Sequence, residues 1–276
     1  MNKRGLVWGV VSGALSAIAF SSGDATAGDQ TVYFNDFDTD VSIEIDPGVA
    51  LLTGVQGFDM LGHPENQFGG QFLRSPSSNI VTLTLGNLPP HDSVSIHFLF
   101  AAIDSLDGTG AFPKGDFFRV DIDDVQIFRE SFANATADQV QSYMPPDGVE
   151  LARRVDLGFN TGSFYLDSAY DMSLDPVFSF IPHTADSITV SFQMEGPGQQ
   201  PLSDESWAVD RLTVLTHNAT ACLADLNDDG ILNFFDVSAF LTAYSAQDPA
   251  ADLTGDGVYD FFDVSAFLSA FAAGCP

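Results

Sequence analysis

Two short segments near the carboxyl end of the chain carry oxygen-bearing side chains at alternate positions, with glycine at position six and aspartate at position twelve. Calcium takes six to eight oxygen ligands, and this spacing turns successive side chains inward as a loop wraps around the ion. The ligand positions of the first segment are Asp225, Asn227, Asp229, Ile231 (through its backbone carbonyl), Asn233 and Asp236. Those of the second are Asp252, Thr254, Asp256, Val258 (again through its carbonyl), Asp260 and Asp263.

The two loops belong to an internal repeat. Residues 224–246 and 251–273 align without gaps, and 15 of the 23 aligned positions are identical. Acidic turns without metal are the alternative, but two loops in matching register favour a duplicated calcium-binding module with one ion per loop. Thr254 offers a neutral hydroxyl where the first loop has Asn227, so we expect the second loop to bind calcium more weakly.

Three features of this module resemble a known family. The twelfth loop position is Asp rather than the Glu of the usual EF-hand pattern, the loop is duplicated, and a single helix follows each loop. In these respects residues 222–276 resemble a type I dockerin, and the ending Gly274-Cys275-Pro276 resembles a subclass of dockerin-like tails on exported bacterial proteins. The resemblance implies a small α-helical module that docks onto a cohesin-like partner or tethers its protein to a cell-surface assembly.

Each expected helix has two distinct faces. Apolar residues at i, i+3, i+4 and i+7 form one face, which packs the repeats together. These are Val237, Phe240, Leu241 and Tyr244, then Val264, Phe267, Leu268 and Phe271. In dockerins the opposite face carries partner recognition, and here it comprises Phe235, Ser238, Thr242, Phe262, Ser265 and Ser269. The alternative is that each phenylalanine covers its loop or the upstream domain.

Cys222 and Cys275 are the two cysteines of the chain, and they bracket this module. An exported module with little core is commonly closed by a disulfide, so we predict a bond between them. Two isolated cysteines do not favour a zinc or redox site.

The amino-terminal segment has the organisation of a secretory signal peptide. Lys3 and Arg4 precede an apolar stretch over residues 6–20, and small residues at 25–27 offer a cleavage site before Gly28. A membrane anchor is the alternative, but the stretch is short and rich in glycine and serine. We therefore expect removal of residues 1–27 during bacterial-type export, leaving a secreted or cell-surface protein without a transmembrane segment.

The chain is strongly acidic, with a formal net charge of −29. Such a polyanion repels nucleic acids and anionic membranes, so neither is expected as a partner. A solvated surface explains most of this charge, but the acids that cluster in loops with glycine and asparagine favour calcium ligation.

Residues 28–217 have the pattern of strands and turns. Apolar and polar residues alternate over residues 81–85, 94–100, 118–122 and 188–192, with Gly, Pro, Asn and Asp between these runs. This pattern predicts a mainly β domain, a jelly-roll-type antiparallel β-sandwich, which a linker at 218–221 joins to the helical module.

Two segments of this domain, Tyr33–Asp38 and Glu205–Asp210, resemble jelly-roll modules of the carbohydrate-binding kind. The resemblance implies adjacent first and last strands that share a structural calcium, with Asp210 and either Asp36 or Asp38 as ligands. An Asx-type turn is the alternative for each acid. The stretches 104–116 and 167–171 also resemble a domain of unassigned function that is common in exported bacterial proteins.

Two functions remain open for the β domain. One is non-catalytic binding, including polysaccharide binding; the other is a glycoside hydrolase, because dockerins typically carry polysaccharide-degrading enzymes. The five histidines are scattered, there is no nucleophile elbow or phosphate loop, and the many acids identify no catalytic pair. Binding is therefore favoured, and the candidate sugar-stacking residues are Trp207, Tyr143, Tyr165 and Tyr170.

Overall fold

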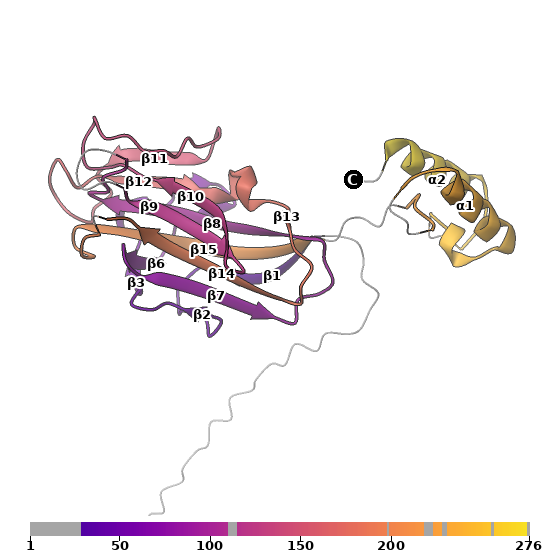
Figure 1. Ribbon diagram of the computed structural model, residues 1–276, viewed down its shortest axis with the longest axis horizontal. Helices are drawn as coiled ribbons and strands as arrows, with labels where there is room; N and C mark the ends of the chain where they lie inside the picture. The colour runs from indigo at the N-terminus through magenta and orange to yellow at the C-terminus, as the bar shows by residue number, and fades with distance from the viewer. Residues whose placement is uncertain are drawn as a thin grey trace, which may run out of the picture.

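The computed structural model describes residues 29–109, 115–197, 199–217, 223–227, 231–254 and 257–274. Figure 1 shows a β-sandwich followed in the chain by a pair of helices, as the sequence predicts. Several predictions fall outside the described residues: the leader 1–27, the linker 218–221, Asp229, Asp256, Cys222 and Cys275. The leader and the disulfide therefore remain predictions.

The larger sheet is antiparallel and contains the two longest strands, β8 and β15, side by side at its centre. Its described strands follow the order β11-β12-β8-β15-β6-β3, with β1 paired to β15 and β13 paired to β8. They are β1 (Gln30–Asn35), β3 (Leu51–Gly54), β6 (Gln71–Pro76), β8 (Ser93–Asp104), β11 (Glu150–Val155), β12 (Asp167–Asp171), β13 (Ile181–Pro182) and β15 (Glu205–His217). The pairing of β1 with β15 confirms that the first and last strands are neighbours.

The smaller sheet, also antiparallel, follows the order β10-β9-β14-β7-β2. Its strands are β2 (Ile45–Asp46), β7 (Ile80–Gly86), β9 (Phe117–Ile122), β10 (Val125–Ser131) and β14 (Ser187–Glu195). A separate short hairpin joins β4 (Gly62–His63) to β5 (Asn66–Gln67).

The main core lies between the two sheets and is rich in aromatic rings. Phe118 on β9 contacts Phe100 on β8 and Trp207 on β15, with ring centroids 4.1 and 5.3 Å apart. Trp207 is fully buried. The alternate apolar residues of the predicted strands supply most of this core, because a strand directs every second side chain to the same face.

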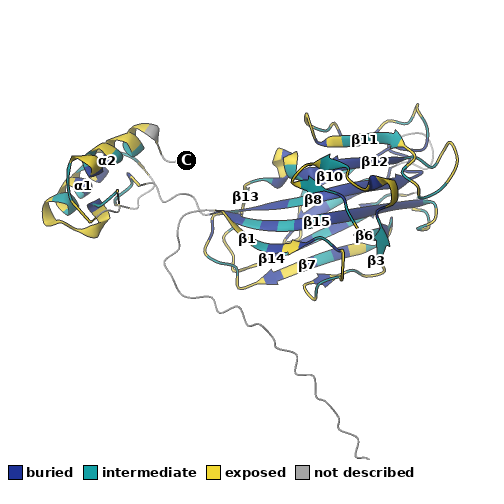
Figure 2. Cartoon of the chain, turned by 180° about the vertical axis from the view of Figure 1, so that it is seen from behind, coloured by how far each residue is buried: buried dark blue, intermediate teal, exposed yellow. Residues whose placement is uncertain are grey.

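A second apolar cluster covers the other face of the larger sheet. Phe58 and Phe68, which precede β6, group with Leu99 and Ala101 of β8. The central strands are therefore buried on both faces, and Figure 2 shows them mostly dark blue. Ser95, one of the polar residues that alternate with apolar ones over residues 94–100, is accordingly only 1% exposed.

The helical unit consists of α1 (Phe234–Ala246) and α2 (Phe261–Ala273), with a small core of its own. The rings of Phe240 and Phe267 stack with their centroids 4.3 Å apart. Leu241 and Leu268, which the helical spacing assigned to this core, are more than half exposed, so the packing face is narrower than predicted. In the part of the chain that the structure describes, no helix is long and apolar enough to cross a membrane.

Candidate functional site

The aspartates at position twelve of the two loops close each loop onto its helix. Asp236 Oδ2 accepts a hydrogen bond from Asn233 N at 2.8 Å, and Asp263 Oδ2 accepts one from Asp260 N at 2.9 Å. Asn233 and Asp260 cap the helices in return, which completes a capping box in both copies. These backbone amides lower the pKa of both position-twelve carboxyls, which favours the charged form that a cation needs.

The described parts of the loops fit calcium. Both position-twelve aspartates are fully buried, and one oxygen of each carboxylate accepts the backbone hydrogen bond that closes its loop. In the second loop, Gly257 N donates to Asp252 Oδ2 at 2.8 Å, so the chain turns sharply at position six. Thr254 Oγ1 lies 3.0 Å from Asp263 Oδ1, and weaker binding at this loop remains a prediction.

Both candidate recognition faces lie at the protein surface. Phe235 and Phe262 are 68% and 66% exposed, and their role in partner recognition remains a prediction. Their neighbours Phe234 and Phe261, which the helical pattern did not single out, are exposed as well. The remaining members of the two faces, all exposed, are Ser238, Thr242, Ser265 and Ser269.

Asp38 and Asp210 hold the same short segment of backbone in the sandwich. Asp38 Oδ1 accepts a hydrogen bond from Gln71 N at 2.9 Å, and Asp210 Oδ2 accepts one from Gly69 N at 3.3 Å. Burial raises the pKa of Asp210 to about 7. Asp36 instead accepts from Asp38 N in an Asx-type turn. The structure thus brings Asp38 and Asp210 near each other, and a calcium shared by them remains a prediction.

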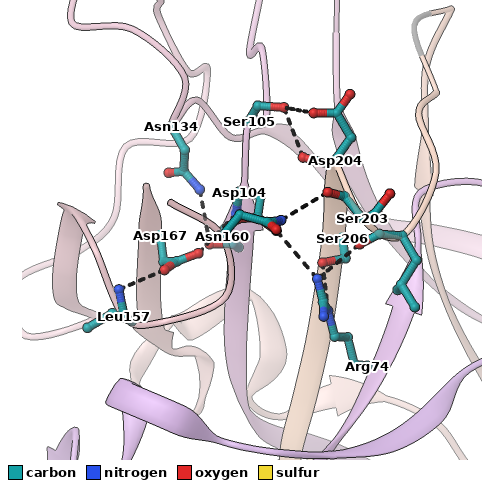
Figure 3. A network of polar contacts seen from close by, with 12 residues as sticks. Arg74, Asp104, Ser105, Asn134, Leu157, Asn160, Asp167, Ser203, Asp204 and Ser206 are labelled. Carbon is teal, nitrogen blue, oxygen red and sulfur yellow. Dashed lines mark hydrogen bonds and ion pairs between the residues drawn. The ribbon is translucent and has the colours of Figure 1, made fainter. Parts of the chain in front are cut away.

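A dense polar network occupies the end of the sandwich where β8 stops and β15 starts (Figure 3). Asp104 Oδ2 accepts a hydrogen bond from Asn160 Nδ2 at 2.7 Å and lies 3.4 Å from Arg74 Nη2. Asp104 N donates to Asp167 Oδ1 at 3.0 Å. Burial raises the pKa of Asp104 to about 6. The sequence drew attention to residues 104–116 and 167–171 only through a resemblance. No motif in the sequence connected Arg74 or Asn160 to these two stretches.

A serine–histidine–aspartate relay connects β8 to the end of β15. His217 Nε2 lies 2.7 Å from Ser95 Oγ, and His217 Nδ1 lies 2.7 Å from Asp29 Oδ1, as in a nucleophilic triad. Ser95 Oγ also accepts a hydrogen bond from Phe180 N at 3.0 Å, and the buried serine is out of reach of a substrate. The relay therefore cross-links strands and does not support catalysis.

The other histidines are less scattered than the sequence indicates. His91 Nε2 lies 2.7 Å from His183 Nδ1, and His183 Nε2 lies 3.1 Å from Asp123 Oδ2. His97 on β8 is partly buried, and this burial lowers its pKa. No spacing in the sequence reveals these contacts, because the partners come from distant segments.

Most of the predicted sugar-stacking residues belong to the core. Trp207, Tyr143 and Tyr170 are buried, which corrects the prediction that they offer platforms; Tyr165 alone of the four is partly exposed. A hollow of about 660 Å³ lies elsewhere, between β1 and the turn after β7. Its lining includes Val32, Tyr33, Glu44, Leu85 and Leu88, and its volume is in the range of small-ligand pockets.

No sequence-family model and no curated protein matches this chain. Among solved structures it is similar to a family 51 carbohydrate-binding module from Clostridium perfringens, at 12% identity and a TM-score of 0.32, over 67% of this chain and 100% of that one. It is also similar to a family 35 carbohydrate-binding module from Clostridium thermocellum, at 10% identity and a TM-score of 0.26, over 68% and 100%. These similarities extend no further than the fold.

Larger proteins also contain a similar domain. A GH115 4-O-methyl-α-glucuronidase, BtGH115A, matches at 13% identity and a TM-score of 0.31 over 72% of this chain. Latent PorU from Porphyromonas gingivalis matches at 11% identity and a TM-score of 0.35, also over 72% of this chain. This chain covers only 19% and 14% of those two proteins.

Proposed function

We propose that this chain is an exported modular protein whose dockerin-like tail binds two calcium ions and docks onto a cohesin-like partner or a cell-surface assembly. The observation that carries the proposal is the duplication itself. Both copies present the same capping box, the same buried aspartate at position twelve and the same exposed phenylalanine beside the loop. Two matched loops with two matched apolar anchors suit a module that first binds calcium and then binds a partner.

The sandwich supplies binding rather than catalysis in this proposal. It is an antiparallel β-sandwich whose end segments resemble carbohydrate-binding jelly rolls, and its hollow leaves room for a small ligand. A hydrolase needs two carboxyls that reach a substrate. Burial raises the pKa of Asp104 and Asp210, as a general acid would require, but both are almost completely inaccessible to solvent. A polysaccharide array separates binding from hydrolysis. Retention of the whole chain without released sugar indicates binding, whereas released sugar indicates hydrolysis.

Docking is tested with the phenylalanine pair. Burying one exposed phenylalanine is worth roughly 2 kcal/mol, and more at a hot spot. The two faces are near copies, so the second face can bind the partner when the first is altered. Phe235→Ser alone should therefore weaken partner binding only slightly. The double variant Phe235→Ser/Phe262→Ser should lose retention on cohesin domains and on washed envelopes of the producing cells, measured with and without calcium.

The matched control is Phe164→Ser/Phe180→Ser, which removes two exposed phenylalanines from the sandwich. Its retention should equal that of the wild type. Calorimetric titration should find unchanged calcium binding in both double variants. If the Phe235/Phe262 variant is retained as well as the wild type, recognition lies elsewhere on the chain.

A further inference from the structure

Three acidic side chains that the predicted ligand sets omit meet at one end of the sandwich. Asp107 follows β8, Asp116 directly precedes β9, and Glu205 is the first residue of β15. One carboxylate oxygen from each lies within 4.8 Å of the other two, and all three residues are buried. Because β9 belongs to the smaller sheet and β15 to the larger one, the cluster spans both layers.

The local structure fixes these groups in place. Asp107 N donates to Asp116 Oδ2 at 2.5 Å, and Gln139 donates to Asp107 Oδ1. Gln200 Nε2 donates to Glu205 Oε1 at 2.8 Å. The other oxygen of Glu205, Oε2, has no hydrogen-bond partner, and the residue is fully inaccessible to solvent. An orphaned carboxylate oxygen costs free energy unless something binds it, so this atom indicates a missing ligand.

The charge balance identifies that ligand as a cation. Among the described residues, the ion pairs of the arginines go to other acids and none reaches these three. Three carboxylates this close cannot all be charged near neutral pH without a compensating positive charge.

We propose that Asp107, Asp116 and Glu205 bind a calcium ion that ties the two sheets together at this end of the sandwich. The groups that meet here are three carboxylates, and carboxylate oxygens select hard divalent cations. Calcium tolerates irregular oxygen cages of this kind better than magnesium, which demands near-octahedral geometry and keeps its waters.

The test is a thermal melt of the whole mature chain, with and without calcium, followed by tryptophan fluorescence. Trp207 is the one tryptophan after residue 27 and is fully buried in the sandwich, so its signal reports this unit alone. Calcium at a hundred times its dissociation constant should raise the melting temperature by roughly 5–10 °C. Glu205→Gln should abolish the shift. In chelator this variant should melt at or above the wild-type temperature, because an amide in place of one of three crowded carboxyls relieves their mutual repulsion.

Glu65→Gln, at an exposed glutamate, is the matched control and should keep the full calcium shift. Asp116→Asn provides a second loss-of-shift variant should Glu205→Gln fold poorly. Lys114, two positions before Asp116 in the sequence, is the rival source of positive charge. The proposal is overturned if calcium leaves the wild-type melting temperature unchanged. It is also overturned if Lys114→Gln lowers the melting temperature in chelator and calcium produces no shift in that variant.

Discussion

At the scale of single residues, burial changes the titration of His97 on β8. His97 is partly buried, and the resulting loss of water lowers the pKa of its imidazole. Asp171 opposes this effect and His217 adds to it. The unfolded chain therefore binds a proton more readily than the folded one below the ordinary histidine pKa of about 6.5.

The sign of the effect on stability follows from this difference. The stabilising contribution of neutral His97 is fully present above about pH 6.5 and is lost as the pH falls toward the lowered folded-state pKa. His97→Gln should therefore lose less stability between pH 7.5 and pH 5.5 than the wild type does. Urea denaturation at the two pH values measures the difference. The exposed control His63→Gln should behave as the wild type; an unchanged pH dependence in His97→Gln would contradict the assignment.

Buried carboxyls such as Asp104 act in the opposite direction. Burial raises the pKa of Asp104 to about 6, so its contribution to stability falls as the pH rises from about 4 toward 6. The pH dependence of the wild-type free energy of unfolding therefore combines a loss at low pH from His97 with a loss at higher pH from Asp104. The comparison between variant and wild type isolates the histidine, because the carboxyls are common to both proteins.

At the scale of elements, the loop after β8 depends on Gly108. Its φ is +63°, and a Cβ there would lie 2.5 Å from Val140 O and 2.7 Å from Ala133 Cβ. An alanine would have to adopt a left-handed conformation and push against the opposing backbone. The glycine thus lets the loop carrying Asp107 lie against the 133–140 segment.

Gly108→Ala should lower the free energy of unfolding by roughly 2–5 kcal/mol, from backbone strain and overpacking together. Gly86→Ala is the matched control: its φ is not in the left-handed region and nothing lies within 4 Å of the place a Cβ would take, so the change should stay within about 0.5 kcal/mol. Chemical denaturation of the two variants provides the comparison. Equal stability of both would show that the loop can move away from residues 133–140.

The strands of the sandwich could be predicted from local alternation, because Val81–Leu85 and Ile188–Phe192 each have one face in the main core. The alternation did not reveal that β8 is buried on both faces: Leu99 and Ala101 lie in the second apolar cluster, and Ser95 is buried and contacts His217. The tail loops were recognisable because their ligands lie within twelve residues. The cluster of Asp107, Asp116 and Glu205 was not, since its members meet only after distant strands pair across two sheets.

In the helices, too, local features could be predicted from the sequence and tertiary packing could not. Their starts follow from the local capping residues Asn233 and Asp260, which the loop pattern already contains. Their packing face depends on how two short helices cross. Phe240 and Phe267 fill that contact by stacking, and this leaves Leu241 and Leu268 outside it.

At the scale of the whole molecule, the two units depend on calcium to different degrees. The sandwich has an extensive aromatic core, whereas among the described residues of the helical unit the fully or nearly fully buried apolar ones are Ala224, Phe240, Ala251 and Phe267. Two helices of 13 residues each are marginal in water without tertiary support. The loop carboxylates repel one another when no ion is bound, which adds a further cost to folding the tail.

Chelation should therefore unfold the tail of the calcium-loaded chain while the sandwich stays folded. Among the described residues the α-helices all belong to the tail, so circular dichroism at 222 nm reports the tail and Trp207 fluorescence reports the sandwich. With the cysteines reduced, excess chelator should remove most of the helical signal at 25 °C. The fluorescence should keep its buried character, although the sandwich should melt at a lower temperature.

Asp225→Ala/Asp252→Ala is the control that separates loss of calcium from other effects of the chelator. It should show the reduced helical signal with or without calcium, and chelator should change that signal no further. The prediction fails if the wild-type helices survive complete calcium removal with the cysteines reduced. In that case the stacked phenylalanines and the capping boxes suffice to fold the tail, and calcium would act only on the shape of the loops that present Phe235 and Phe262.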